Sequence, residues 1–339
     1  MERFKIIGNA PEEEKEKVKK TYEDRLCSHA ETLVGIDKEN FRKFEYPKTE
    51  KELKIINLIN KETNRLLEEV GVKPFDVSSD NFHIVPPEIY KKIKNKEDNS
   101  SAATSFEYQV MIFDAEKSRD NSMNFLADSL HELLHLKSHT SIQVEKDGEK
   151  IKSHLFREGM GVRASAKKIK EIGHHMHFNG LHEAIVATQE KKSFHELIKD
   201  PIFAEEKRVM ESQEFLEAKK KISEKSNIPE DEFTWVDTNK KKFFSFGYLS
   251  IRKTLDYVLE EIQKEFSEKY ASKDDVFKEF LKAHLQGGLL TIAHLVEDTF
   301  GDGSFRLLGN MDKDTNSAIT HLETLKQGRN RFLKSKEKK

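Results

Sequence analysis

FLADSLHELLHL, residues 125–136, contains the most informative pattern in this chain. His131 and His135 stand four positions apart in an apolar run without glycine or proline, which is typical of a buried helix. Residues four apart lie on one helix face, about 40° from each other, so the two imidazoles could bind one zinc ion. Glu132 would project beside that ion, where it could take a proton from a zinc-bound water. The pattern therefore predicts a metal site on this helix.

An alternative is a core helix without a metal, in which the histidines hydrogen-bond to the backbone and Glu132 meets an arginine or lysine. Leucines surround the polar triplet, so two histidines and a glutamate would be buried. Burying them without partners costs roughly several kcal/mol together. A zinc ion would offset that cost, and we therefore favour the metal site.

Composition limits the possible partners. The chain has 339 residues, of which 35% are charged, and its net charge of -2 gives no general attraction to nucleic acid or anionic lipid. No apolar run approaches the ~20 residues that cross a bilayer, and the first eight residues lack the hydrophobic part of a secretory signal. The lone Cys27 cannot form an intrachain disulfide. We expect a cytoplasmic protein with no nucleic-acid or membrane partner; the sequence does not determine its oligomeric state.

The pattern of apolar residues predicts an α+β protein that is predominantly α-helical. Residues 1–75 read as an N-terminal helical region, in which Pro11 followed by three glutamates favours a helix start. Residues 76–200 read as a catalytic core, and residues 201–339 as a C-terminal helical domain. Apolar stripes over 251–266 and 276–292 predict core helices there.

Within 76–200 the sequence predicts a small sheet and several helices. Asp147-Gly148 between alternating segments is a strong hairpin signal, and Asn121 or Ser122 would cap the helix that carries the histidines. The remaining expected elements are strands at 81–85 and 108–113, hairpin strands at 141–144 and 151–156, and helices at 164–172 and 181–191.

A catalytic zinc site usually has three protein ligands and one open position, so a third ligand is needed. One known pattern places glycine and histidine shortly after the helix, but Ser138 and Ser141 stand at those positions. His139 would be a third ligand on one straight helix, and such ligands splay away from a single ion. We therefore look for the third ligand on another segment.

Glu183 is the best candidate for the third ligand. It lies among apolar residues in the helix expected at 181–191, and the intervening hairpin could fold that helix back beside the first. Glu183 could instead occupy the first helical turn only because a carboxylate is favoured by the helix dipole. His182 would point about 100° away from Glu183, so only one of the two can face the metal. His174, His175 and His177 are weaker candidates.

His131, Glu132, His135 and the downstream GLHEA segment (180–184) resemble the gluzincin class of zinc metallopeptidases over roughly residues 105–195. The resemblance implies two histidines and a glutamate as zinc ligands, within a zincin-like core of a small mixed sheet plus the active-site helix. It also implies a sheet edge strand that holds the substrate peptide by backbone pairing, for which 108–113 is the natural candidate.

The chain departs from that class at one position. Many gluzincins carry an aspartate four residues after the ligand glutamate, to orient a zinc histidine, but this chain has Ala187 there. The orienting groups must therefore come from elsewhere, and Asp128, one turn before His131, is one candidate.

We expect a zinc metallopeptidase that acts on peptides or proteins, with Glu132 as general base for a metal-activated water. Tyr248 is our candidate for stabilising the oxyanion, with His175 and Arg163 as others. One alternative is a non-enzymatic helical interaction protein whose metal motif is structural or coincidental; another is a zinc hydrolase that acts on a non-peptide amide. The ligand types favour zinc, although iron, cobalt or manganese would also suit them.

Overall fold

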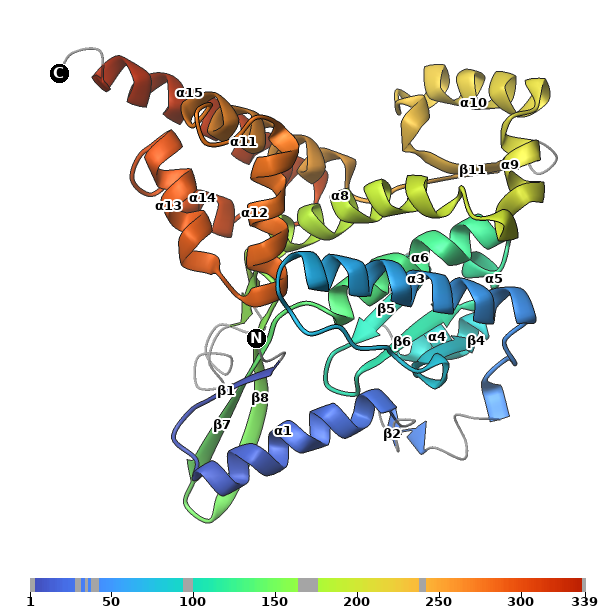
Figure 1. The fold of residues 1–339 in the computed structure, drawn as a ribbon, viewed down its shortest axis with the longest axis horizontal. Helices are drawn as coiled ribbons and strands as arrows, with labels where there is room; N and C mark the ends of the chain where they lie inside the picture. The colour runs from blue at the N-terminus through green and yellow to red at the C-terminus, as the bar shows by residue number, and fades with distance from the viewer. Residues whose placement is uncertain are drawn as a thin grey trace.

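The computed structural model describes residues 4–27, 32–33, 36–37, 43–93, 100–163, 176–237 and 242–336. These residues form an α+β fold that is predominantly helical and contains small mixed sheets, as predicted (Figure 1). In this part of the chain, no helix combines the length and the hydrophobicity that a bilayer crossing requires. The helix expected at 164–172, together with His174 and His175, lies outside the described residues.

The first third of the chain supplies one side of the molecule. The glutamates after Pro11 do begin a helix, α1, and a capping box at Thr49 begins α3. The elements are β1 (Phe4–Ile7), α1 (Glu12–Cys27), β2 (Thr32–Leu33), β3 (Ile36–Asp37), α3 (Glu50–Glu69), η1 (Ser79–Asn81), β4 (Phe82–Val85), α4 (Pro87–Ile93), β5 (Ala102–Ser105), β6 (Val110–Asp114) and α5 (Ala115–Ser118).

The middle of the chain contains the two helices that matter most for the site. They are α6 (Ser122–Leu136) and α8 (Asn179–Leu197), separated by β7 (Thr140–Asp147), β8 (Lys150–Glu158), β9 (Gly161–Arg163) and β10 (Met176–His177). The Asn121 side chain accepts a hydrogen bond from the Asn124 backbone N–H and so caps α6, which confirms the cap predicted for this helix.

The remainder of the chain is mainly helical but includes a short hairpin of β11 and β12. The apolar stripe predicted at 251–266 is the buried face of α11, and the second stripe is divided between α12 and α13 by Gly287-Gly288. The elements are η2 (Pro201–Phe203), α9 (Ala204–Met210), α10 (Gln213–Ser226), η3 (Glu230–Glu232), β11 (Phe233–Asp237), β12 (Lys242–Ser245), α11 (Leu249–Glu265), α12 (Lys273–Gln286), α13 (Leu289–Phe300), α14 (Ser304–Gly309) and α15 (Thr315–Lys336).

Strands from two sheets precede and follow α6 along the chain. A three-stranded sheet has the order β4-β6-β5, with β4 parallel and β5 antiparallel to the central β6. A five-stranded sheet has the order β1-β7-β8-β9-β10. Its β7–β8 hairpin turns at Asp147-Gly148, where Gly148 has φ +62°, and this confirms the predicted hairpin. The N-terminal β1 pairs in parallel with β7, so the first residues contribute a strand as well as helices.

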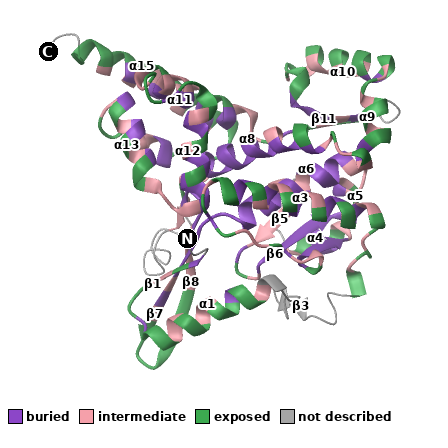
Figure 2. Ribbon diagram, in the orientation of Figure 1, coloured by how far each residue is buried: buried purple, intermediate pink, exposed green. Residues whose placement is uncertain are grey.

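The core is built around α6 and α8. Helix α6 packs against α3, α8 and β5, while α8 also contacts α11 and α12. Figure 1 shows α8 running across α6 and α3, and Figure 2 shows that α6 and α8 are buried along most of their length. One continuous hydrophobic cluster extends from α3 through these two helices to α15. Both helices are therefore held on several sides.

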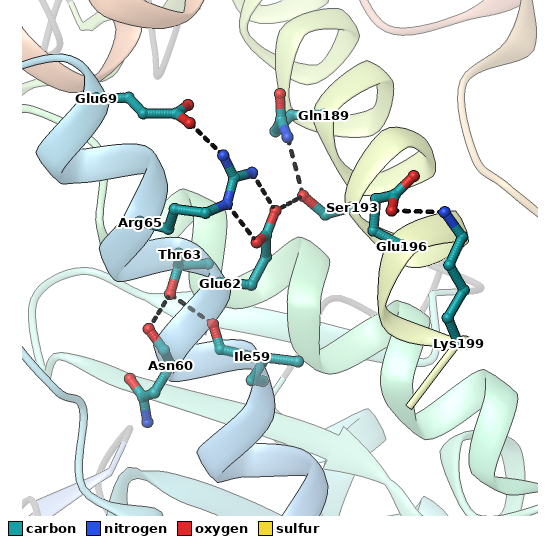
Figure 3. A network of polar contacts seen from close by, with 10 residues as sticks. All are labelled: Ile59, Asn60, Glu62, Thr63, Arg65, Glu69, Gln189, Ser193, Glu196 and Lys199. Atoms are coloured by element: carbon teal, nitrogen blue, oxygen red, sulfur yellow. Dashed lines mark hydrogen bonds and ion pairs between the residues drawn. The ribbon is translucent and has the colours of Figure 1, made fainter. Parts of the chain in front are cut away.

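A polar network fastens α3 to α8 (Figure 3). The buried Ser193 hydroxyl accepts a hydrogen bond from Gln189 at 2.9 Å and donates one to Glu62 of α3 at 2.6 Å. Arg65 completes the network with two hydrogen bonds to Glu62. Burial alone would raise the pKa of Glu62, but its bonds to Arg65 and Ser193 hold that pKa below its ordinary value.

Candidate metal centre

Helices α6 and α8 bring the three predicted ligands together. His131 and His135 lie one turn apart on the face of α6 that meets α8, and their Nε2 atoms are 3.1 Å apart. Glu183 enters from the first turns of α8, with its Oε2 atom 3.5 Å from His131 Nε2 and 3.2 Å from His135 Nε2. We call these three residues the metal-ligand group; among the described residues, they form a group that could hold a metal ion.

The spacing of the three ligand atoms fits a small divalent cation. In a tetrahedral site with bonds of 2.0–2.1 Å, neighbouring ligand atoms are about 3.3 Å apart, and the three observed distances lie close to this value. Glu183 Oε2 is buried and, within the described part of the chain, has no ordinary hydrogen-bond partner. Two imidazole lone pairs and a carboxylate oxygen that face one another repel unless a positive charge lies between them. The group therefore requires a cation or a proton.

The pKa values of His131 and Glu183 also indicate that a positive charge belongs in this group. Burial lowers the pKa of His131, but the carboxylates of Glu190 and Glu183 outweigh burial and raise it well above its ordinary value. Burial raises the pKa of Glu183, but His135 and His131 hold it well below its ordinary value. In the metal-free molecule a proton on His131 thus supplies the positive charge that a metal ion would supply.

The metal-free alternative considered for α6 does not describe these contacts. That alternative places backbone groups against the histidines and an arginine or lysine against Glu132. In the structure, the ring nitrogens of His131 and His135 face Glu190, His182, Glu183 and each other. Glu132 is bonded by the Thr104 hydroxyl.

Glu190 orients the first histidine. Its Oε2 atom lies 2.7 Å from Nδ1 of His131, and its side chain is buried. The Nδ1–H group therefore donates to this carboxylate, which directs the other ring nitrogen, Nε2, to the metal position, where its lone pair could bind a metal ion. The sequence interpretation missed Glu190 because it looked for an acid at position 187, where buried Ala187 stands. Glu190 is two helical turns after Glu183, and that spacing was the available signal.

His182 orients the second histidine. Its Nε2 atom lies 2.8 Å from His135 Nδ1, so it faces the back of the ligand rather than the metal position, as its place on the helix predicted. Burial, followed by the nearby His135 and His284, holds the pKa of His182 well below its ordinary value. A neutral His182 accepts the His135 N–H, which again leaves Nε2 of His135 free to bind a metal.

Glu132, which we expected to act as general base beside the metal, lines a cavity. The cavity has a volume of about 520 Å³ and is also lined by the metal-ligand group. The Thr104 hydroxyl of β5 lies 2.7 Å from Glu132 Oε2 and 2.9 Å from the Glu132 carbonyl oxygen. Residues from β5, α6, α8 and the β11–β12 hairpin surround this cavity. A molecule in the cavity would therefore meet the carboxylate and the metal position together.

One expectation about the strand beside the site was wrong. We expected 108–113 to be the sheet edge strand, but β6 is the central strand, paired with β4 on one side and β5 on the other. Among the described residues, strand β5 is one of the two outer strands of this sheet, and its residues Ala102, Ala103 and Thr104 line the cavity. The segment that we expected at the edge, 108–113, is the more hydrophobic one. A strand that is buried on both faces is the more apolar one, so its hydrophobicity indicates a central position instead.

The other predicted site residues have different positions. Tyr248 lines the cavity, its ring nearly parallel to that of His131, with centroids 5.9 Å apart. It begins α11 in a left-handed conformation, φ +61°, which is unusual for tyrosine and is found at functional sites. Arg163 also lines the cavity and donates two hydrogen bonds to Glu158. His177 is exposed on β10, and His139 is bonded to Ser141 outside the metal-ligand group.

Asp128 does not orient a histidine, contrary to the possibility raised from the sequence. Its carboxylate faces the hydroxyls of Ser101 and Ser118, while Glu190 takes the orienting position. Asp128 is offset by only about 60° from His131 around α6, so its hydrogen bonds to Ser101 and Ser118, rather than its place on the helix, decide what it contacts. It lies in the wall of the same cavity.

Comparison with protein-family models, curated proteins and solved structures found no match for this chain.

Proposed function

We propose that this protein is a zinc-dependent metallopeptidase with a zincin-like core. The observation that carries the proposal is the convergence of His131 Nε2, His135 Nε2 and Glu183 Oε2 beside a cavity that Glu132 also lines. Two histidines and a carboxylate are a donor set that suits zinc, and three ligands beside a cavity leave a position for a reacting molecule. A purely structural zinc site would instead have four protein ligands.

The chemistry is divided between the metal and the chain. A zinc ion held by His131, His135 and Glu183 would supply a Lewis acid for the substrate carbonyl and for the attacking water. Glu132 accepts a proton from that water and returns it to the leaving amine, and Thr104 holds the carboxylate in place. Tyr248 donates a hydrogen bond to the oxyanion that develops on the carbonyl.

The outer strand β5 orients the substrate. It runs along α6 and forms part of the cavity wall, with Thr104 contacting Glu132 directly. An extended peptide can add to such a strand by backbone hydrogen bonds, which positions a peptide bond without reading its side chains. This placement favours a peptide over another amide as substrate.

The decisive experiment separates metal binding from turnover. We expect one zinc per chain in the purified full-length protein, measured by elemental analysis after dialysis. Glu132→Gln should keep the metal but lose at least about a hundredfold of the hydrolysis rate on a peptide library. Glu183→Gln should lose both metal and activity. Glu196→Gln, the same change at an exposed ion pair on α8, is the matched control.

Two results would contradict the proposal. Normal hydrolysis by Glu132→Gln would exclude Glu132 as the base. Stoichiometric zinc in Glu183→Gln would show that the ligands are other residues.

A further inference from the structure

Asp128, Ser101 and Ser118 form a polar bridge between three elements, which we call the Asp128 bridge. The Ser101 hydroxyl donates to Asp128 Oδ1 at 2.8 Å. The buried Ser118 hydroxyl of α5 lies 2.7 Å from Asp128 Oδ2 and 3.1 Å from the Ser101 carbonyl oxygen. Ser101 immediately precedes β5, so the bridge joins the start of that strand to α6 and α5.

A proton on Asp128 would add one hydrogen bond to the Asp128 bridge. The Ser118 hydroxyl has one hydrogen but faces two acceptor oxygens. If Asp128 is ionised, that hydrogen can satisfy only one of them. If Asp128 is protonated, its Oδ2–H donates to Ser118, and Ser118 donates to the Ser101 carbonyl. The protonated form therefore has one more hydrogen bond, and that bond holds the strand.

The surroundings also favour a proton on Asp128. Burial raises its pKa to about 6, against the lowering effect of the Ser118 and Ser101 bonds, and the carboxylates of Glu190 and Glu132 raise it further. From α5, Lys117 directs its ammonium group to the Ser100 carbonyl at 3.5 Å. Asp114, at the end of β6, caps α5 by accepting the Glu116 backbone N–H.

Among the described residues, the bridge is one of two places where side-chain hydrogen bonds link the β5 segment to α6. The other is Thr104, whose hydroxyl contacts Glu132 one helical turn after Asp128. The Ser101 carbonyl also accepts the Asp114 backbone N–H, which continues the pairing with β6. Because both attachments lie beside the cavity, movement at Ser101 would shift the strand relative to Glu132.

We propose that Asp128 is a positioning residue that, while it carries a proton, fixes the start of β5 against α5 and α6 and so sets the place of the substrate-binding strand. This inference rests on the proposed peptidase function. Loss of the proton as the pH rises removes one bond from the Asp128 bridge and loosens β5. A bound metal ion, being positive, moves this transition toward lower pH.

The first test is backbone hydrogen exchange of residues 102–105 in the metal-free full chain, which needs no activity. Asp128→Asn keeps a neutral donor and acceptor and should preserve protection at both pH 5.5 and pH 7.5. Asp128→Ala removes the hydrogen bonds of the carboxyl group to both Ser101 and Ser118 and should increase exchange at least about fivefold at both values. The unmodified chain should match the Asn variant at pH 5.5 and approach the Ala variant at pH 7.5.

The second test is steady-state kinetics of the zinc-loaded protein on a peptide substrate. At pH 7.5, Asp128→Ala should have a KM about fivefold above that of Asp128→Asn with little difference in kcat, and the KM of the unmodified chain should move from the low toward the high value as the pH rises. Ser129→Ala is the control and should change neither parameter, because the buried Ser129 hydroxyl on the same helix has no hydrogen-bond partner among the residues that the structure describes.

Three outcomes would overturn the inference: the Asn variant exchanging as fast as the Ala variant, no pH-dependent difference in the unmodified chain, or an equal effect of Ser129→Ala. Absence of peptide hydrolysis in the unmodified chain would instead contradict the proposed function. In that case the exchange data alone would still support or refute the Asp128 bridge.

Discussion

The Nδ1 atom of His131 lies 2.7 Å from the Glu190 carboxylate, so α8 supplies both the candidate ligand Glu183 and the acid behind the first histidine. Two turns of one helix thus contact the front and the back of the same imidazole. Because α8 is buried along most of its length, both carboxylates are held on a rigid element.

Replacing Glu190 should weaken metal binding without removing a ligand. Glu190→Gln loses the charge that fixes the orientation of His131 and its Nδ1 proton, and we expect about a 10- to 100-fold loss of zinc affinity. Titration against a chelator of known affinity measures this change. Glu196→Gln on the exposed face of the same helix should leave the affinity unchanged. Equal affinities for the two variants would show that Glu190 has no orienting role.

Tyr248→Phe removes one hydroxyl and keeps the ring beside His131. If Tyr248 stabilises the oxyanion, kcat should fall about 100-fold while zinc content and KM remain close to normal. Tyr257→Phe, at a partly buried tyrosine of α11 that does not line the cavity, is the control for loss of a tyrosine hydroxyl. An unchanged kcat would show that Tyr248 does not stabilise the oxyanion, and Arg163, which also lines the cavity, would then be the next candidate.

Gly159 leaves space for the rings of His182 and His284, which lie behind the metal-ligand group. A Cβ atom there would lie 2.5 Å from the His284 ring and 2.8 Å from His182 Nδ1, and its φ of +52° also disfavours other residues. Gly159→Ala should cost about 2–4 kcal/mol of unfolding free energy and weaken zinc binding, because His182 must shift away from His135. Urea unfolding and zinc titration measure both effects.

Gly148→Ala is a matched control for Gly159→Ala. Gly148 has a similar φ of +62° in the β7–β8 turn, but apart from its chain neighbours no atom of the described residues lies within 4 Å of its added Cβ. Gly148→Ala should therefore lower the free energy of unfolding only through the unfavourable backbone conformation, by about 1–2 kcal/mol, and should leave the zinc affinity unchanged. If the two variants behave alike, packing against the histidines is not important.

His139 should make the fold sensitive to acid. Burial, with Arg157 and Lys5 nearby, lowers its pKa from 6.5 to about 4. The unfolded chain then binds more protons between these values, so this contribution to stability is present above pH 6.5 and is lost as the pH falls toward 4. Between pH 7 and pH 5 we expect a loss of about 2 kcal/mol.

The variant His139→Gln can keep the hydrogen bond to Ser141 without titrating, and it should show a smaller loss of stability than the unmodified chain. Denaturant unfolding of the metal-free protein at the two pH values provides the comparison. His177→Gln, at an exposed histidine of β10, should not reduce the pH dependence. An identical pH dependence in His139→Gln and the unmodified chain would contradict this assignment.

Local sequence signals predicted the elements of the site well. Asn121 caps α6 and Asp147-Gly148 forms the hairpin turn, because each depends on hydrogen bonds and dihedral angles within a few residues. The placement of His131 and His135 on one face follows from the helical repeat alone. The position of Glu183 beside them required only that two apolar helices pack together.

Relationships between distant segments could not be derived in this way. The choice of β5 rather than β6 as the outer strand depends on how three strands are ordered, which their individual patterns do not encode. Glu190 was missed for a related reason: its side chain becomes an orienting group only once α6 lies at a particular height along α8. The same holds for Asp128, which faces Ser101 and Ser118 across two other elements.

That a buried helix presents two histidines and a glutamate follows from the order of residues along the chain, because helical periodicity and capping act over a few residues. The groups that surround them follow from the packing of the folded chain: Glu183 and Glu190 from α8, Thr104 from β5 and Tyr248 from the start of α11. These contacts depend on how the apolar faces of separate elements pack, and many arrangements satisfy the same apolar pattern.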